Sequence, residues 1–314
     1  MENIKKIPLV VVVGPTASGK TALGVALAKA LGGEIVSADS MQIYDGMPIA
    51  AAVPSMEERD GIVHHLMEFL PQGSEFSVAD YVNLAKETIF DINRRGKLPI
   101  LVGGTGLYVN SLIDNITFVE EKKDDALRER LEREFDDLGG EEMLRRLGEF
   151  DPESAKRLHA NNRRRIIRAF EVYLQTGKTA TALNAESKSE PSPFNAVMLG
   201  ITYESRETLY ERINKRVDIM LENGLLEEAR AHCTDERKGS GQAIGHKEFL
   251  PYFGGECSLE EATEKLKRET RRYAKRQYTW FCRDERINWL YADREENIVS
   301  AAMKIIKEGR ILEG

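Results

Sequence analysis

Apolar and polar positions alternate between two patterns along the first hundred residues. Residues 7–13 form a continuous apolar run rich in β-branched side chains, which predicts a strand buried on both faces. Residues 20–31 instead carry leucines at helical spacing and are followed by two glycines, which predicts a helix and its end. Apolar runs at 33–39 and 97–103 predict two more strands, and the segment between them, with Ser77 as the expected N-cap, predicts a helix. This order indicates an α/β fold with a parallel sheet.

The pattern of apolar and charged residues changes between about residues 118 and 185. Strand signals vanish and charged amphipathic helices take over, until a linker-like stretch precedes a return to the strand pattern near residue 196. A helical insertion within an α/β core accounts for this order better than two consecutive domains do. We therefore expect a first part of the core at residues 1–117, a helical insertion domain at 118–190, and a second part with strands and long helices at 191–314.

Composition and charge exclude several classes of protein. The chain has 41% hydrophobic and 31% charged residues and no apolar run near the ~20 residues of a membrane helix, so we expect a globular protein without membrane association. Three cysteines, without disulfide or metal spacing, favour a reducing cytoplasm. The net charge of −7 argues against a globally basic nucleic-acid binder, but acidic and basic stretches are separated, so a local basic surface stays possible.

The segment after the first predicted strand fits the pattern G-x-x-x-x-G-K-[ST]. Such a loop, placed between a strand and a helix start, surrounds phosphate oxygens with backbone N–H groups. Lys20 adds a positive charge, and the Thr21 hydroxyl is a ligand for Mg²⁺. The expected fold is therefore a P-loop NTPase-like parallel sheet flanked by helices, with an all-α insertion domain. The expected phosphate-binding residues are Gly14, Pro15, Thr16, Ala17, Ser18, Gly19, Lys20 and Thr21.

A carboxylate follows the second predicted strand rather than the third. Nucleotide hydrolases usually hold their magnesium with an acid at the end of an apolar strand, but the third strand here runs into glycines and Thr105. Asp39 instead stands at the carboxyl end of the second strand, where open α/β sheets bind ligands. It is either a turn or cap aspartate, or, as its position beside the phosphate loop favours, a general base or a metal-linked carboxylate. Two reactions fit this arrangement: phosphate transfer to a small hydroxyl compound, or transfer with pyrophosphate as the leaving group.

Two predicted helices carry concentrated positive charge. Residues 162–177 place an apolar stripe opposite an arginine cluster, and residues 265–280 spread seven Lys and Arg residues over about half of the helix circumference. Arginine faces of this kind are usually only solvated, yet two of them in an acidic protein suggest a track for a polyanion such as RNA. The stripe consists of Ile166, Ala169, Phe170, Tyr173 and Leu174, and the arginines are Arg164, Arg165 and Arg168.

Nine stretches spread over almost the whole chain carry a family resemblance: GPTASGKT, SADSMQIYDGM, HHL, FSVADY, LPILVGGTGLY, RRIIRAFEVYLQTGK, YERINKRVDIM, QAIGHKE and RRYAKRQYTWF. In content and order they resemble the bacterial tRNA dimethylallyltransferases, also called tRNA isopentenyltransferases. That family transfers a dimethylallyl group from dimethylallyl diphosphate to N6 of the adenosine 3′ of the anticodon. The resemblance therefore implies a prenyltransferase of tRNA processing, with tRNA and dimethylallyl diphosphate as partners.

The resemblance also implies a role for each candidate residue. The cradle would hold the donor diphosphate with Mg²⁺ on Thr21, and Asp39 would take the N6 proton. Lys20, Thr21 and the arginines Arg206 and Arg212 would stabilise the departing pyrophosphate. The target base would be extruded to reach the donor. The residues implied to contact the tRNA anticodon stem-loop are Asp39, Ser40, Met41, Gln42, Thr105, Arg128, Arg164, Arg165, Ile166, Ile167, Arg168, Gln242, Ala243, Ile244, Gly245, His246 and Lys247.

Several positions depart from the family pattern. Residues 49–54 read I-A-A-A-V-P where relatives usually read I-G-T-A-K-P, which removes a glycine, a hydroxyl and a lysine. His246 and Cys282 stand where tyrosine and arginine are common, and three further positions also differ. We expect these changes to alter affinity without abolishing transfer. The three further positions are Val63, Ala160 and Asn162.

Three other functions stay open at this point. Prenyl transfer to free AMP uses the same chemistry but has no use for two basic helices. A metabolite kinase would transfer phosphate from ATP without tRNA. An RNA-binding protein with a vestigial cradle would transfer nothing, and the altered loop at residues 50–53 is its motivation. Because no exposed interface pattern stands out, we expect a cytoplasmic monomer.

Overall fold

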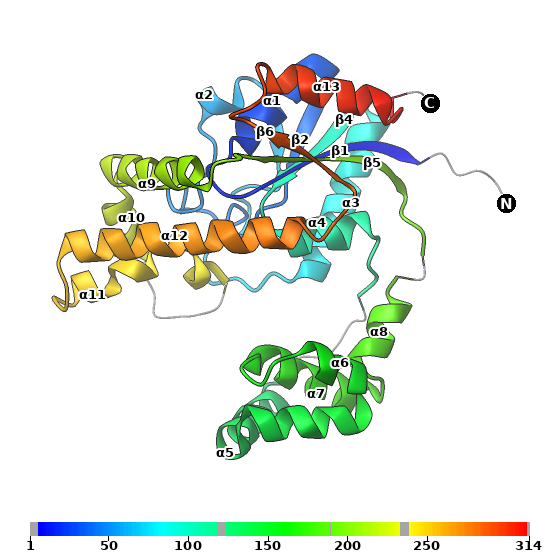
Figure 1. Ribbon diagram of the computed structural model, residues 1–314, viewed down its shortest axis with the longest axis vertical. Coiled ribbons are helices and arrows are strands. Elements are labelled where there is room, and N and C mark those ends of the chain that lie inside the picture. Colours follow the sequence, from blue (N-terminus) through cyan, green and yellow to red (C-terminus); the bar gives the residue numbers. More distant parts are fainter. Residues whose placement is uncertain (1–5, 119–123, 189, 233–238, 313–314) are drawn as a thin grey trace. The chain divides into compact units, whose positions relative to one another are not determined.

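The computed structural model describes residues 6–118, 124–188, 190–232 and 239–312. Contacts divide the chain into two compact units, residues 1–113 with 192–314, and residues 114–191 (Figure 1). No described helix has both the length and the apolar character required to span a membrane. Cys257 and Cys282 are free thiols, and Cys233 lies outside the described residues.

The first unit is built on a six-stranded parallel sheet with the strand order β3-β2-β4-β1-β5-β6. The central strand β1 is completely buried from Leu9 to Val13, as expected for an apolar run covered on both faces. The predicted α/β class is confirmed. The strands are β1 (Ile7–Val13), β2 (Gly33–Ser37), β3 (His64–His65), β4 (Leu98–Gly103), β5 (Phe194–Thr202) and β6 (Ile287–Tyr291).

Helices cover both faces of this sheet (Figure 1). Leu27 of α1 and Ile306 of α13 share one apolar cluster with Val10 and Val12 of β1, whereas α3 and α4 lie on the opposite face. Burying each such side chain stabilises the fold by about 1.5–3 kcal/mol. The helices of this unit are α1 (Lys20–Leu31), α2 (Met56–Arg59), α3 (Val78–Arg94), α4 (Gly106–Ile113), α9 (Arg206–Glu222), α10 (Leu225–His232), α11 (Leu250–Phe253), α12 (Leu259–Phe281) and α13 (Ile298–Glu308), with short 3-10 helices at Gly239–Gln242 and Lys247–Phe249.

Capping residues fix where two long helices of this unit, α3 and α12, begin. Ser77 accepts the Asp80 N–H at the start of α3, and the Asp80 carboxylate accepts the Ser77 N–H in return. Ser258 and Glu261 form the same reciprocal pair at the start of α12. With its start fixed, α12 runs along the unit and brings its last turns to the loops at the carboxyl edge of the sheet (Figure 1).

The second unit contains only helices among its described residues. They are α5 (Asp125–Phe150), α6 (Pro152–Arg157), α7 (Arg163–Thr176) and α8 (Ala180–Glu186). The backbone leaves helical geometry inside α5 at Gly139, where φ is 78°. The buried Asp151 carboxylate accepts the Ser154 N–H at 3.0 Å and the Thr181 hydroxyl at 2.6 Å, which ties α6 to α8. That residues 118–190 fold as an independent domain stays a prediction.

The buried face of α7 differs from the predicted stripe, most clearly at Leu174 and Glu171. Leu174 is 50% exposed, whereas Glu171 is buried. The Glu171 carboxylate lies 3.2 Å from the Arg128 guanidinium and 3.6 Å from that of Arg168. A buried carboxylate between two cations is tolerable because it is paired. The polar pattern alone places a glutamate on the outer face, which is why the prediction was wrong here.

Candidate active site

The loop between β1 and α1 is shaped as a phosphate cradle. Gly14 has no room for a side chain, because a Cβ there would lie 2.2 Å from the Ile201 carbonyl oxygen. Ala17 and Gly19 have φ angles of 61° and 99°, and these left-handed residues turn successive backbone N–H groups inward. The Ser18 hydroxyl is buried and has no hydrogen-bond partner among the described residues. The loop thus presents donors and a polar void of the kind an anion fills.

Lys20, the first residue of α1, points its ammonium group back into this loop. Its Nζ donates to the Pro15 carbonyl oxygen at 2.7 Å. The pKa of Lys20 is lowered to about 8: burial lowers it most, the Asp39 carboxylate opposes the shift, and the Arg216 guanidinium adds to it. A charge with so little compensation favours a bound anion. Thr21 follows at the half-buried start of the helix.

Asp39 lies just after the end of β2, and its charge affects the pKa of several groups around the phosphate loop. One carboxylate oxygen, Oδ1, accepts the Met41 N–H at 2.9 Å, so the expected turn role is present. The same carboxylate acts electrostatically on Lys20 and Arg216. Because the carboxylate has a second oxygen, the turn bond and a role as proton acceptor are compatible.

The turn after β4 is bonded directly to the segment that carries Asp39. The Thr105 hydroxyl oxygen accepts the Ser40 N–H at 3.0 Å, and the Thr105 N–H donates to the Ala38 carbonyl at 3.1 Å. Gly103 must be glycine, because a Cβ would lie 2.2 Å from the Ala38 carbonyl oxygen. The structure therefore brings Thr105 and residues 38–40 together, as the resemblance implies.

Gln42 is held by its own neighbours. Its Oε1 accepts the Ser37 hydroxyl at 2.8 Å, and its Nε2 donates to the Ala52 carbonyl at 3.0 Å. Met41 packs beside an apolar cluster that includes Ile43. The altered loop at residues 49–54 thus supports Gln42 through its backbone, which a side-chain replacement does not remove.

Tyrosines form the wall beside Asp39. Tyr81 and Tyr108 stack with ring centroids 4.0 Å apart, and the Tyr81 hydroxyl donates to the Ser37 carbonyl at 3.0 Å. Burial, and to a lesser degree the Asp39 charge, raise the pKa of Tyr81, Tyr108 and Tyr273 above the ordinary value. These hydroxyls remain neutral donors at physiological pH.

The three arginines of α9 differ in how they approach the cradle. The Arg212 Nε donates to the Ala17 carbonyl at 3.2 Å, and its guanidinium lies 5.1 Å from the Tyr203 ring centroid. Arg206 is exposed at the first turn of α9, and no hydrogen bond joins it to the loop among the described residues. Arg216, one turn beyond Arg212, is half-buried; burial lowers its pKa, while the Asp39 and Glu58 charges oppose the shift.

Sequence reasoning missed Arg216. The spacing of four between Arg212 and Arg216 places both side chains on one face of α9, and this was the available signal. Of the arginines on α9, Arg216 is the one that acts electrostatically on both Lys20 and Asp39.

The segment of residues 242–247 contributes less side-chain surface than expected. Ala243 and His246 are buried, and the His246 Nε2 lies 2.8 Å from a Glu228 carboxylate oxygen. The Glu228 carboxylate also accepts the N–H groups of Ile49 and Ala50 at 2.8 and 2.9 Å. His246 therefore supports the altered loop, while Lys247 is exposed. The side chain of Gln242 lies outside the described residues.

In the second unit, the predicted tRNA-contacting residues separate into two groups. Arg164, Arg165 and Arg168 are exposed on α7, whereas Ile166 and Ile167 are buried. The isoleucines hold the helix in its unit and offer no surface to a ligand, which corrects their place in the predicted set. Arg128 is bonded to Glu171 and lies 3.2 Å from Glu132.

The basic surface predicted on α12 is partly tied into the fold. The Lys267 Nζ lies 2.7 Å from an Asp218 carboxylate oxygen of α9, and Arg271 donates to the Asn214 Oδ1 at 2.5 Å. Arg272 pairs with Glu269 of its own helix at 2.7 Å. Much of this charge is therefore compensated within the protein.

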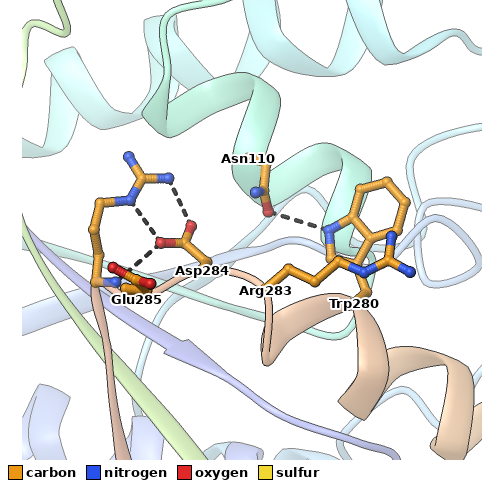
Figure 2. A pocket seen from close by; sticks show the side chains of 6 residues that line it. Asn110, Trp280, Arg283, Asp284 and Glu285 are labelled. Carbon is orange, nitrogen blue, oxygen red and sulfur yellow. Dashed lines mark hydrogen bonds and ion pairs between the residues drawn. The ribbon is translucent and has the colours of Figure 1, made fainter. Parts of the chain in front are cut away.

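A separate pocket of about 450 Å³ lies at the C-terminal end of α12 (Figure 2). The Trp280 indole N–H donates to the Asn110 Oδ1 at 3.3 Å on one side, and Asp284 is bonded to Arg286 on the other. None of the predicted site residues lines it.

Among the described residues, no group of three or more His, Cys, Asp or Glu side chains is placed to hold a metal ion. A magnesium ion held mainly by substrate phosphates and water needs only one or two protein oxygens. The half-buried Thr21 hydroxyl beside Lys20 fits that arrangement.

The chain matches two protein-family models. The IPP transferase model covers residues 42–284, and the isopentenyl transferase model covers residues 7–74. Among curated relatives, the tRNA dimethylallyltransferase of Acetivibrio thermocellus is 48% identical over 93% of each chain. That of Bacillus subtilis (strain 168) is 46% identical over 92% of each chain.

Solved structures show the same similarity. The full-length tRNA isopentenylpyrophosphate transferase of Bacillus halodurans is 42% identical, with a TM-score of 0.71 over 98% of this chain and 99% of that one. A eukaryotic dimethylallyltransferase acting on tRNA is 31% identical, with a TM-score of 0.82 over 98% of this chain and 80% of that one. With a P-loop, a carboxylate after β2 and matches along nearly its whole length, the chain belongs to the IPP transferase family.

Proposed function

We propose that this protein transfers a dimethylallyl group from dimethylallyl diphosphate to N6 of the adenosine 3′ of the anticodon in tRNA, releasing pyrophosphate. The observation that carries the proposal is the arrangement of charges at the cradle. Lys20 and Arg216 lie within electrostatic reach of one another and of Asp39, beside the buried, unpartnered Ser18 hydroxyl. Two cations at a phosphate loop and a carboxylate beside them suit a leaving diphosphate and an acceptor that loses a proton.

The cradle acts on the leaving group. The C–O bond between the allylic carbon and the diphosphate breaks as the N6–carbon bond forms, and the negative charge that develops on pyrophosphate is met by Lys20, Arg216 and the loop N–H groups. Arg212 braces the loop through its bond to the Ala17 carbonyl. When bound, Mg²⁺ supplies further charge stabilisation to the phosphate oxygens, with Thr21 as its protein ligand.

Asp39 acts on the acceptor. Its Oδ1 is fixed by the Met41 N–H, which leaves the other oxygen to accept the proton that N6 loses on alkylation. The Asp39 carboxylate lies within electrostatic reach of Lys20 and Arg216, while the neutral tyrosine hydroxyls bring no competing charge. Thr105 holds the Asp39 segment in place through Ser40.

tRNA is the proposed acceptor because the second unit carries an exposed arginine face. Arg164, Arg165 and Arg168 suit the phosphates of an anticodon stem-loop, and Lys247, with the backbone of residues 242–247, suits bases near the extruded adenosine. Extrusion is required, since N6 of a stacked base does not reach a buried diphosphate. We place this reaction in the cytoplasm and assign it to a monomer.

One assay separates the candidate functions. The protein is incubated with labelled dimethylallyl diphosphate, Mg²⁺ and one of three acceptors: unmodified tRNA, AMP or none. We expect label on tRNA alone. Label on AMP instead establishes adenylate prenyl transfer, phosphate transfer from ATP without tRNA establishes a kinase, and tRNA binding with no transfer establishes an RNA-binding protein. Any of these three results overturns the proposal.

A further inference from the structure

Gln277 connects two loops that are distant from it in sequence. It lies near the end of α12, and only 6% of the residue is exposed. Its Oε1 accepts the N–H of Thr16 in the cradle at 2.9 Å, and its Nε2 donates to the carbonyl of Gly104, in the turn after β4, at 3.0 Å. The fit is close: a Cβ on Gly104 would lie 2.2 Å from the Gln277 Nε2.

Tyr273, one helical turn earlier, reaches the same place. Its hydroxyl interacts with the side chains of Thr105 and Gln277. Thr105 in turn binds the Ser40 N–H, next to Asp39. A continuous set of hydrogen bonds therefore runs from the cradle through Gln277 to the segment that holds the proposed base.

The two backbone groups require an amide at this position. Gln277 is a donor and an acceptor at once, whereas an ionised glutamate only accepts and a methionine of similar length does neither well. A buried N–H or carbonyl left without its partner costs about 1–3 kcal/mol. Because both groups belong to loops of the site, the loops themselves are expected to move if the amide is lost.

We propose that Gln277 is a positioning residue, which sets the cradle and the acceptor turn at the spacing that alkylation requires. This inference rests on the proposed function. Gln277 has no part in the bond changes; it acts by holding the Thr16 N–H and the Gly104 carbonyl at a fixed separation. The Thr16 N–H is thereby committed to the protein and is not available to the diphosphate.

Two substitutions and a matched control test the proposal. Gln277→Met removes both bonds, and Gln277→Glu retains the bond from Thr16 while placing a negative charge beside the cradle. Thr270→Val is the control, because it removes a hydroxyl of α12 whose one bond among the described residues goes to the carbonyl of Leu266 in the same helix, at 2.8 Å. Each variant is assayed for kcat and KM with tRNA and donor, for affinity toward inorganic pyrophosphate with Mg²⁺, and for its melting temperature.

We expect Gln277→Met to lower kcat about 10–100-fold, as misplacement of reacting groups does, with little change in KM for tRNA. Its pyrophosphate affinity falls, and that of Gln277→Glu falls further because of like-charge repulsion. Thr270→Val matches the wild type. If Gln277→Met does not fold, Gln277→Glu carries the test alone.

Two results overturn the inference: a folded Gln277→Met protein with wild-type kcat and pyrophosphate affinity, or a drop in melting temperature with kcat per folded molecule unchanged. Failure of the proposed function looks different, because the wild type itself then transfers no label to tRNA. In that case the pyrophosphate measurements still decide whether Gln277 positions the cradle.

Discussion

At the scale of single residues, the site consists of a few charges that compensate one another incompletely. Lys20 has a lowered pKa and, within the described part of the chain, donates to one loop carbonyl, and Arg216 is half-buried. Asp39 acts on both. Such a cluster is ready for an anionic ligand, and each member is expected to affect a different stage of the reaction.

Asp39→Asn is expected to lower kcat at least 100-fold, the ordinary contribution of a general base, with KM for donor and tRNA close to wild type. The amide retains the turn bond to Met41 but does not take the proton. Steady-state kinetics with labelled donor measure the effect. Asp45→Asn, an exposed neighbour in the same segment, is the control. A folded Asp39→Asn protein that turns over at the wild-type rate contradicts the assignment.

Arg216→Gln is expected to lower kcat by about 10²–10³, the usual cost of losing one preorganised donor at a developing negative charge. The substitution removes a cation that acts electrostatically on both Lys20 and Asp39. Single-turnover transfer rates measure it, with Lys215→Gln, an exposed neighbour on α9, as the control. Equal rates for the two variants would show that Arg216 acts only in folding.

At the scale of elements, the predicted strands agree best with the structure where a long apolar run marks the strand in the sequence. The apolar runs placed β1, β4 and β5 correctly, since a strand buried on both faces has few alternatives. β3 was not predicted because it is only two histidines long. His65 bonds Glu34 and the Nδ1 of His64 bonds the Ile62 carbonyl, whereas the Nε2 of His64 is buried without a hydrogen-bond partner among the described residues.

The site residues also fall into those that a local sequence pattern predicts and those that it does not. The cradle and Asp39 follow from local motifs at strand ends, whose chemistry is visible in the sequence. Gln277 and Arg216 do not, because a glutamine or arginine in a charged helix looks like surface until the fold brings it to a loop. Thr16 and Gln277 are 261 residues apart, and no local pattern encodes that contact.

The ion pairs of β2 give a pH dependence at this scale. Bonds from Arg95, assisted by His65, lower the pKa of Glu34 to about 2 against the opposing effect of burial. A lowered carboxyl pKa stabilises the fold above the unfolded-state value near 4.3, and this stabilisation is lost as pH falls from about 5 toward 2.

Glu34→Gln is therefore expected to cost about 2 kcal/mol at pH 7, after allowance for the partly exposed Arg95, and progressively less at lower pH. Urea unfolding from pH 7 to pH 3 measures the difference from wild type. Glu87→Gln, an exposed glutamate of α3, is the control. A difference that does not shrink with falling pH contradicts the assignment.

At the scale of the whole molecule, the proposed function assigns the chemistry to the first unit and tRNA binding largely to the second. The first unit contains the cradle and Asp39, and the second carries an arginine face on a helix anchored by the buried Ile166 and Ile167. Affinity for tRNA and affinity for pyrophosphate are therefore expected to respond to different substitutions.

Arg165→Gln is expected to weaken tRNA binding and to reduce the slope of log affinity against log salt by about 1, as the loss of one phosphate contact does. Pyrophosphate affinity stays unchanged. Fluorescence titrations of tRNA at several salt concentrations measure the slope, with Arg94→Gln, an exposed arginine of the first unit, as the control. An unaltered slope places Arg165 away from the RNA.

The strand order β2-β4-β1 has a consequence for the donor. The cradle follows β1 and Asp39 follows β2, so the two are separated by the width of β4, about 9–10 Å at ordinary strand spacing. Gly103 ends the intervening strand and Gly104 follows it, so neither residue adds a side chain of its own at this edge of the sheet. Under the proposed function, the spacing of the strands sets the distance between the diphosphate and the acceptor amine. This distance is long enough for a five-carbon alkyl group. A ten-carbon allylic diphosphate is expected to compete for the cradle without being transferred, which competition assays with labelled donor will measure.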